Sequence, residues 1–206
     1  MNSNRRKLLQ TAVLASTTFC LPSLARSTDS PDASKIIEAI KSRRSVRAYT
    51  AAPISASDLK TILECGMLAP SAANEQPWEF IVIEDKAILG KIGEINHYAS
   101  FAKHAPLAIL ACLNEAKEKE KGMGVLDIAI ACENMLLAAH ALGLGGVFTG
   151  IYPIKERIEG FQKLADLPAT VVPIGLLVFG HPQINSVRSP DRFNADAIHK
   201  NKWNAK

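Results

Sequence analysis

The chain has 206 residues, of which 48% are hydrophobic and 21% are charged. This length and composition favour one folded domain and exclude a chain that is disordered over most of its length. Lys and Arg (24) outnumber Asp and Glu (20), but Arg5, Arg6 and Lys7 supply most of the excess, so the rest of the chain does not indicate a nucleic-acid-binding surface.

The first 25 residues have the three parts of an export signal. A basic start is followed by a weakly apolar run over 8–21, and Ser23 and Ala25 are the small residues of a signal-peptidase site. The run is too short and too polar for a stable membrane span. The pair Arg5-Arg6 resembles a twin-arginine signal. We expect a signal peptide over 1–25, a linker over 26–33 and a periplasmic domain over 34–206. The alternative is a basic N-terminus on a cytoplasmic protein.

The spacing of apolar residues predicts the helices and strands in chain order. Helices are expected over 34–42, with Ser34 as N-cap, and over 57–68, 86–95, 123–142 and 154–165. Short runs rich in β-branched residues predict strands over 79–84, 106–113, 146–149 and 171–179. Together they predict an α+β fold, a central sheet flanked by helices. The segment 123–142 is apolar nearly all round, so we expect a buried central helix.

Two other groups of residues are assigned no chemistry. The charged run 114–121 is expected to be a solvated loop or helix end. The cysteines are scattered, form no CxxC pair and indicate no metal site, so each is expected to be a buried apolar residue: Cys20, Cys65, Cys112 and Cys132.

Three arginines and a serine follow the first predicted helix of the domain, as Arg43-Arg44-Ser45-Val46-Arg47. The planar guanidinium group suits bidentate contact with a phosphate or with the acceptor edge of a heteroaromatic ring. The alternative is an exposed basic helix end, which the helix dipole favours.

A loop of small and polar residues spans 69–78. Its small side chains would let a flat ligand approach, and Ser71, Asn74 and Gln76 offer hydrogen bonds. The same composition is common in simple connecting loops.

Two further stretches are weak signals when taken singly. The glycine-rich turn over 143–150 would bring backbone close to a ligand, but it follows a helix and is therefore not the dinucleotide-binding fingerprint. Gly180-His181-Pro182 precedes Arg188 and Arg192, which could bind a phosphate or form a basic tail.

Taken together and in this order, the four stretches resemble the nitroreductase family of FMN-dependent oxidoreductases, over about residues 34–203. The resemblance implies the family's fold, a mainly antiparallel sheet in an intertwined homodimer with FMN at the interface.

The resemblance also implies roles for single residues. Arg43 and Ser45 would bind the phosphate and ribityl region, and Arg47 would be the cation near flavin N1 and O2. Arg44 is expected to be a further cofactor-binding residue. The partner subunit would lend the loop Pro70–Asn74, with Pro70, Ser71, Ala72 and Asn74, against the ring. Gln76 also matches the family's cofactor-binding motif, whereas Trp78 is expected to have a packing role. Phe148, Thr149 and Gly150 would flank the flavin edge, and Arg192 would be a second phosphate ligand. Pro190 stands where family members often carry a basic residue, so Arg188 is a candidate replacement.

The implied activity is a ping-pong, two-electron transfer to a nitroaromatic or quinone, with NADH or NADPH as the usual donor and no catalytic side chain. An exported enzyme would meet no free nicotinamide pool, which favours a quinol or a redox protein as donor. The alternatives are a flavin-binding protein without turnover, a flavin-dependent dehydrogenase or dehalogenase with a non-nicotinamide partner, and a structural periplasmic domain.

Overall fold

The core of the protein is a four-stranded antiparallel sheet with the order β1-β2-β4-β3. The strands are β1 (Trp78–Ile83), β2 (Leu107–Asn114), β3 (Gly145–Gly150) and β4 (Val171–Gly180). The computed structural model describes residues 31–183 and 191–203, so the predicted export signal lies outside the described residues. The predicted α+β fold with a central antiparallel sheet is confirmed.

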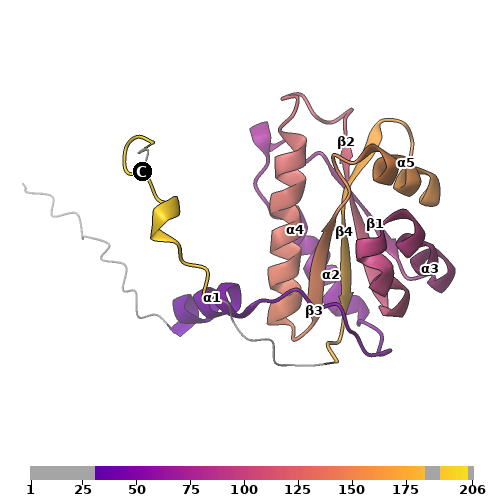
Figure 1. The fold of residues 1–206 in the computed structure, drawn as a ribbon, viewed down its shortest axis with the longest axis horizontal. Coiled ribbons are helices and arrows are strands. Elements are labelled where there is room, and N and C mark those ends of the chain that lie inside the picture. Colours follow the sequence, from indigo (N-terminus) through magenta and orange to yellow (C-terminus); the bar gives the residue numbers. More distant parts are fainter. Residues whose placement is uncertain (1–30, 184–190, 204–206) are drawn as a thin grey trace, which may run out of the picture.

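Helices cover both faces of the sheet (Figure 1). They are α1 (Pro31–Ser42), α2 (Ala56–Met67), α3 (Lys86–Ile95), α4 (Gly124–Ala141) and α5 (Lys155–Leu164). Ile62 of α2 and Met135 of α4 pack in one core cluster with β2 and β4. Leu89 of α3 and Phe161 of α5 pack in a second cluster on the other face. Because both faces are covered, β2 is apolar and buried along almost its whole length.

Local signals explain several helix ends. The Ser55 side chain accepts a hydrogen bond from the Asp58 amide and caps α2, and Asp85 caps α3 in the same way. Gly143 follows α4 with a φ of 77°, the left-handed conformation that favours glycine. The predicted start of α1 is wrong, because the helix begins at Pro31, where proline's fixed φ suits a first turn. Residues 31–33 are therefore helical rather than linker.

Three 3-10 segments were not predicted: Ala72–Asn74, His97–His104 and Ala195–Ala197. The expectation of a fully solvated charged run is wrong at one residue, since Glu118 is buried. Its carboxylate accepts hydrogen bonds from the amides of Gly122 and Gly124, at 2.9 and 2.8 Å, and so fixes the start of α4.

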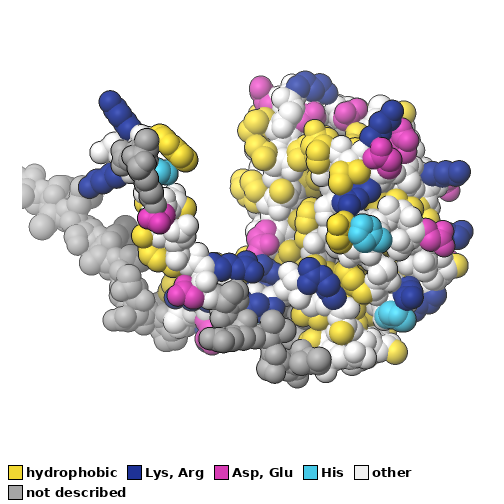
Figure 2. Space-filling view, in the orientation of Figure 1, with side chains coloured by type: hydrophobic (Ala, Val, Ile, Leu, Met, Phe, Trp, Pro, Cys, Tyr) yellow, Lys and Arg dark blue, Asp and Glu magenta, His cyan; other side chains and the backbone are white. Residues whose placement is uncertain are grey.

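The expectation of a buried helix α4 holds for one side only. Met135 is fully buried, whereas Leu126 and Ile130 are exposed in the single chain. α4 is also, within the described residues, the one helix long and apolar enough to cross a bilayer, but here it packs against α2 and the sheet. Figure 2 shows hydrophobic side chains on the flank that α4 forms.

The two ends of the described chain extend beyond the body of the domain (Figure 1). α1 leaves Ile36, Ile37 and Ile40 largely exposed, and the C-terminal segment 191–203 does the same with Phe193 and Trp203. Apolar side chains therefore point to solvent on both projecting segments.

Candidate functional site

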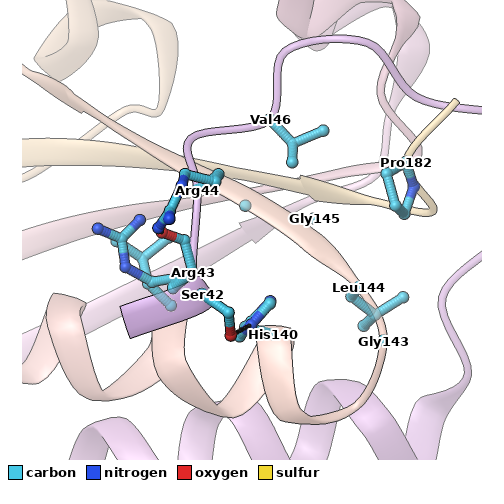
Figure 3. A pocket seen from close by; sticks show the side chains of 11 residues that line it. Ser42, Arg43, Arg44, Val46, His140, Gly143, Leu144, Gly145 and Pro182 are labelled. Carbon is cyan, nitrogen blue, oxygen red and sulfur yellow. Dashed lines mark hydrogen bonds between the residues drawn. The ribbon is translucent and has the colours of Figure 1, made fainter. Parts of the chain in front are cut away.

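A cavity of about 340 Å³ lies where the end of α1, the end of α4 and the start of β3 meet (Figure 3). It brings together the arginine run, the glycine-rich turn and the Gly180-His181-Pro182 stretch, which are far apart in the sequence. Its lining residues are Ser42, Arg43, Arg44, Val46, Leu136, His140, Gly143, Leu144, Gly145, Gly146 and Pro182.

Two arginines of this cavity are held by different partners. Arg43 Nε donates to the Glu133 carboxylate on α4 at 3.2 Å. Arg44 Nη1 donates to the carbonyl oxygens of Lys41 at 2.7 Å and Arg43 at 2.5 Å. Arg44 Nε is buried and has no hydrogen-bond partner among the described residues. Since a buried donor is normally paired, this N–H is a candidate to bind an anionic ligand.

The backbone after the arginines packs directly on β3. The Val46 amide donates to the Gly146 carbonyl at 3.1 Å. A Cβ on Gly145 would lie 2.8 Å from Val46 Cβ, and a Cβ on Gly146 would lie 2.8 Å from the Phe179 ring. These two glycines thus make room for protein side chains, a packing role that the sequence pattern did not reveal.

Tyr49 fixes the far end of this segment. Its ring is buried, and its hydroxyl lies within hydrogen-bond distance of the carbonyl oxygens of Val46 and Val178. Burial raises the pKa of Tyr49, so the hydroxyl stays protonated and can donate. The C-terminal end of the arginine run is therefore anchored to the core.

His140 was not predicted as a site residue. Its Nε2 atom lies 2.7 Å from the Ser42 hydroxyl oxygen, and in Figure 3 the two side chains point toward each other. Partial burial, with added repulsion from Arg43 and Arg44, lowers the pKa of His140. It lies seven residues after Glu133, two helical turns along α4, but only the tertiary contact between Glu133 and Arg43 shows that this helix face meets the arginine run.

The predicted ligand loop lies at the opposite end of α4. The Ala72 amide donates to Asp127 Oδ1 at 3.1 Å, in the first turns of α4, whereas His140 is in the last turn. At about 1.5 Å per residue these positions are about 20 Å apart along the helix axis. Within one chain the loop is therefore distant from the arginine cavity.

The loop itself has an unusual backbone. Ala73, Asn74 and Gln76 have φ values of 47°, 57° and 51°. The Gln76 amide donates to the Ser71 hydroxyl at 3.0 Å, and Gln76 Nε2 donates to Asn74 Oδ1 at 3.1 Å. Pro70 and Asn74 are exposed, so the loop presents its small and polar residues outward.

The other predicted residues are divided between the strand β3 and the surface. Phe148 is 38% exposed and its ring packs over Gly175 of β4. Thr149 is buried and donates to the Leu176 carbonyl at 3.2 Å, while the Gly150 carbonyl accepts from Arg157 at 2.9 Å. Exposed positions outside the cavity lining are Ser45, Arg47 and Arg192; Arg188 and Pro190 lie outside the described residues.

A model of the nitroreductase family matches residues 40–99 and 94–181, which contain the loop and all of the cavity lining except Pro182. The chain belongs to the nitroreductase family. A Methanothermobacter thermautotrophicus protein, provisionally named NADH dehydrogenase/NAD(P)H nitroreductase, is 42% identical over 82% of this chain and 87% of its own length.

Solved structures show the same nitroreductase relationship. A provisionally named NADH oxidase from Clostridium acetobutylicum has a TM-score of 0.77 and 39% identity, covering 80% of this chain and 99% of its own. A provisionally named nitroreductase from Desulfovibrio desulfuricans, solved in complex with FMN, has a TM-score of 0.71 and 31% identity, covering 82% and 97%.

The residues of this cavity suit the phosphate of such a cofactor. Two guanidinium groups lie in its wall, and the unpaired Arg44 Nε offers a buried donor. Ser42 adds a hydroxyl group, and His140 adds an imidazole. This donor set fits a phosphate monoester better than it fits an apolar ligand.

Proposed function

We propose that this nitroreductase-family enzyme binds FMN, with the phosphate in the cavity of Arg43 and Arg44, and transfers electron pairs to an electron-poor acceptor such as a nitroaromatic or quinone. The observation that carries the proposal is the buried, unpaired Arg44 Nε beside a second guanidinium group. The FMN complex of the Desulfovibrio relative supports the choice of cofactor.

A homodimer would complete the site. The arginine cavity and the loop 70–76 lie at opposite ends of α4, so one chain cannot place both around one flavin. Two α4 helices packed antiparallel about a two-fold axis would bring the loop of one protomer to the cavity of the other. The exposed apolar residues Leu126 and Ile130, and the projecting ends of the chain, supply surface that such a dimer would bury.

The side chains then bind and orient, and need not act as acids or bases. When bound, FMN supplies the two-electron redox chemistry. Arg47 would stabilise negative charge at the N1–O2 edge of the ring. Phe148, held over Gly175, would pack beside the ring, and the loop would exclude water from its other side.

Purified protein tests the proposal directly. We expect the flavin absorption bands in the isolated dimer and anaerobic bleaching by NADH, NADPH or a reduced quinone. Reoxidation by a nitroaromatic or quinone in a separate step would give ping-pong kinetics. A colourless protein that gives no fluorescence change in an FMN titration would contradict the proposal, and binding without reduction by any donor would favour the non-enzymatic alternative.

We also propose that the first 25 residues export the folded, flavin-loaded protein to the periplasm by the twin-arginine route. Changing both Arg5 and Arg6 to Lys should trap loaded protein in the cytoplasm; unchanged periplasmic recovery would contradict the route. In the periplasm a quinol or redox protein is the more available donor. Fast reduction by low micromolar NADH or NADPH would instead favour a cytoplasmic site of action.

A further inference from the structure

The loop 70–76 is held by the buried carboxylate of Asp127, a residue of α4 that lies outside the loop's own sequence motif. Asp127 is 4% exposed, and its Oδ1 atom accepts the Ala72 amide hydrogen at 3.1 Å. Its Oδ2 atom is buried and has no hydrogen-bond partner among the described residues. An unpaired buried carboxylate oxygen is costly, so stability alone is a poor explanation for this side chain.

The segment that Asp127 holds needs an external support. A positive φ is unfavourable for residues other than glycine. Three non-glycine residues within Ala73–Gln76 have a positive φ. Glu75 supplies a second support, because its carboxylate accepts the Lys119 amide hydrogen at 2.8 Å. Asp127 and Glu75 therefore tie the loop to α4 and to the segment before it.

We infer that Asp127 is a positioning residue that presets the loop 70–76 for packing against the flavin ring of the partner subunit. The inference rests on the proposed function. A loop already held in its binding conformation loses less conformational entropy when the ring binds, so the cofactor is bound more tightly. Because the loop would contact the ring and the arginines would contact the phosphate, the two sets of residues should affect flavins differently.

Fluorescence titrations with FMN and with riboflavin, which lacks the phosphate, separate these contributions. Asp127→Ala should weaken the binding of both flavins about 10-fold and leave the ratio of the two affinities unchanged, since losing this hydrogen bond to a charged group costs about 1.5–3 kcal/mol. Asp127→Asn keeps an acceptor oxygen and should bind both flavins nearly as the unchanged protein does.

Asn96 offers a matched control. It is 1% exposed, its Oδ1 atom accepts the Tyr98 amide hydrogen at 3.2 Å, and its Nδ2 atom is unpaired among the described residues. Asn96→Ala should lower the free energy of unfolding without changing flavin affinity. If Asp127→Ala does not fold, Asp127→Ser replaces it, because the shorter side chain cannot reach Ala72.

Any of three results would overturn the inference. The first is that Asp127→Ala binds both flavins with unchanged affinity. The other two are that Asn96→Ala or Asp127→Asn loses as much flavin affinity as Asp127→Ala does. Failure of the proposed function is distinguishable, because the unchanged protein itself would then not bind FMN.

Discussion

The Ser42 hydroxyl oxygen lies 2.7 Å from His140 Nε2 and so joins the last residue of α1 to the last turn of α4. The contact lies in the wall of the arginine cavity. The charged groups near His140 are Arg43 and Arg44, which directly follow α1, and Glu133 of α4, which is paired to Arg43. Partial burial and these two cations therefore disfavour protonation of the imidazole and lower the pKa of His140.

The stability of the protein should depend on pH through His140. Partial burial, followed by the repulsion from the two arginines, lowers the pKa of His140. The folded chain thus binds fewer protons at this residue than the unfolded chain does. The free energy of unfolding should fall as the pH drops through about 6.5, the ordinary His value. Urea unfolding between pH 5 and 7.5 should show that His140→Gln loses less unfolding free energy at low pH than the unchanged protein does. An identical loss in the two proteins would show that His140 does not cause the pH dependence.

Binding of FMN should be coupled to proton uptake by His140. A phosphate dianion between the arginines would raise the pKa of His140 again, while the phosphate itself takes up a proton near pH 6. Lowering the pH from 7.5 to 6 should therefore weaken FMN binding less in the unchanged protein than in His140→Gln. Riboflavin titrations are the control, in which the two proteins should have the same pH dependence. Equal pH dependence with FMN would exclude His140 from the phosphate site.

Arg44→Ala should weaken FMN binding about 10-fold or more, because a charge-assisted hydrogen bond to phosphate contributes roughly 1.5–3 kcal/mol. Riboflavin affinity should stay unchanged. Arg192→Ala should behave in the same way if this residue is the second phosphate arginine. A fluorescence titration measures each affinity, and an equal loss with riboflavin would indicate damage to the fold.

Dimerisation should depend on the exposed side of α4. Ile130→Glu places a charge on the apolar face and should shift the protein to the mass of one chain in sedimentation experiments, with loss of bound FMN. Tyr98→Glu is the control, because Tyr98 is 64% exposed on the other side of the sheet, beside α3. A flavin-loaded species with the mass of one chain would contradict the shared site.

The two glycines at the start of β3 should not tolerate a side chain. In Gly146→Ala the new methyl group would lie 2.8 Å from the Phe179 ring and 2.9 Å from Leu136, so overpacking should cost about 1–3 kcal/mol of unfolding free energy. Gly90→Ala, in helix α3, has no atom within 4 Å of the new methyl group and should stabilise the protein by about 0.5–1 kcal/mol. Denaturant unfolding of both variants measures the difference.

The sequence predicted the regular elements well because their signals are local. α3 was predicted with its observed bounds, Lys86–Ile95, where Asp85 caps a periodic apolar run. The 3-10 segment His97–His104 was not predicted, although the side chain of Asn96 caps it and Ala99 and Ala102 bury one face. Glu118 was taken for a surface charge because its partners are backbone amides, which no residue pattern reveals.

The site was predicted less completely, for a different reason. The arginine run and the loop were recognised as separate motifs, but nothing in a linear pattern shows that they lie at opposite ends of α4. His140 and Asp127 belong to neither motif. They acquire their roles because each lies on the turn of α4 that meets one of the motifs, which depends on the tertiary arrangement.

The cysteines also bear on where the protein can work. Cys112 on β2 and Cys132 on α4 are buried in clusters on opposite faces of the sheet, and burial raises the pKa of each thiol to about 12. Thiols that remain protonated and inaccessible react slowly with oxidants and disulfides. The folded domain should therefore keep these two thiols reduced even in an oxidising compartment, without a reducing system to protect them.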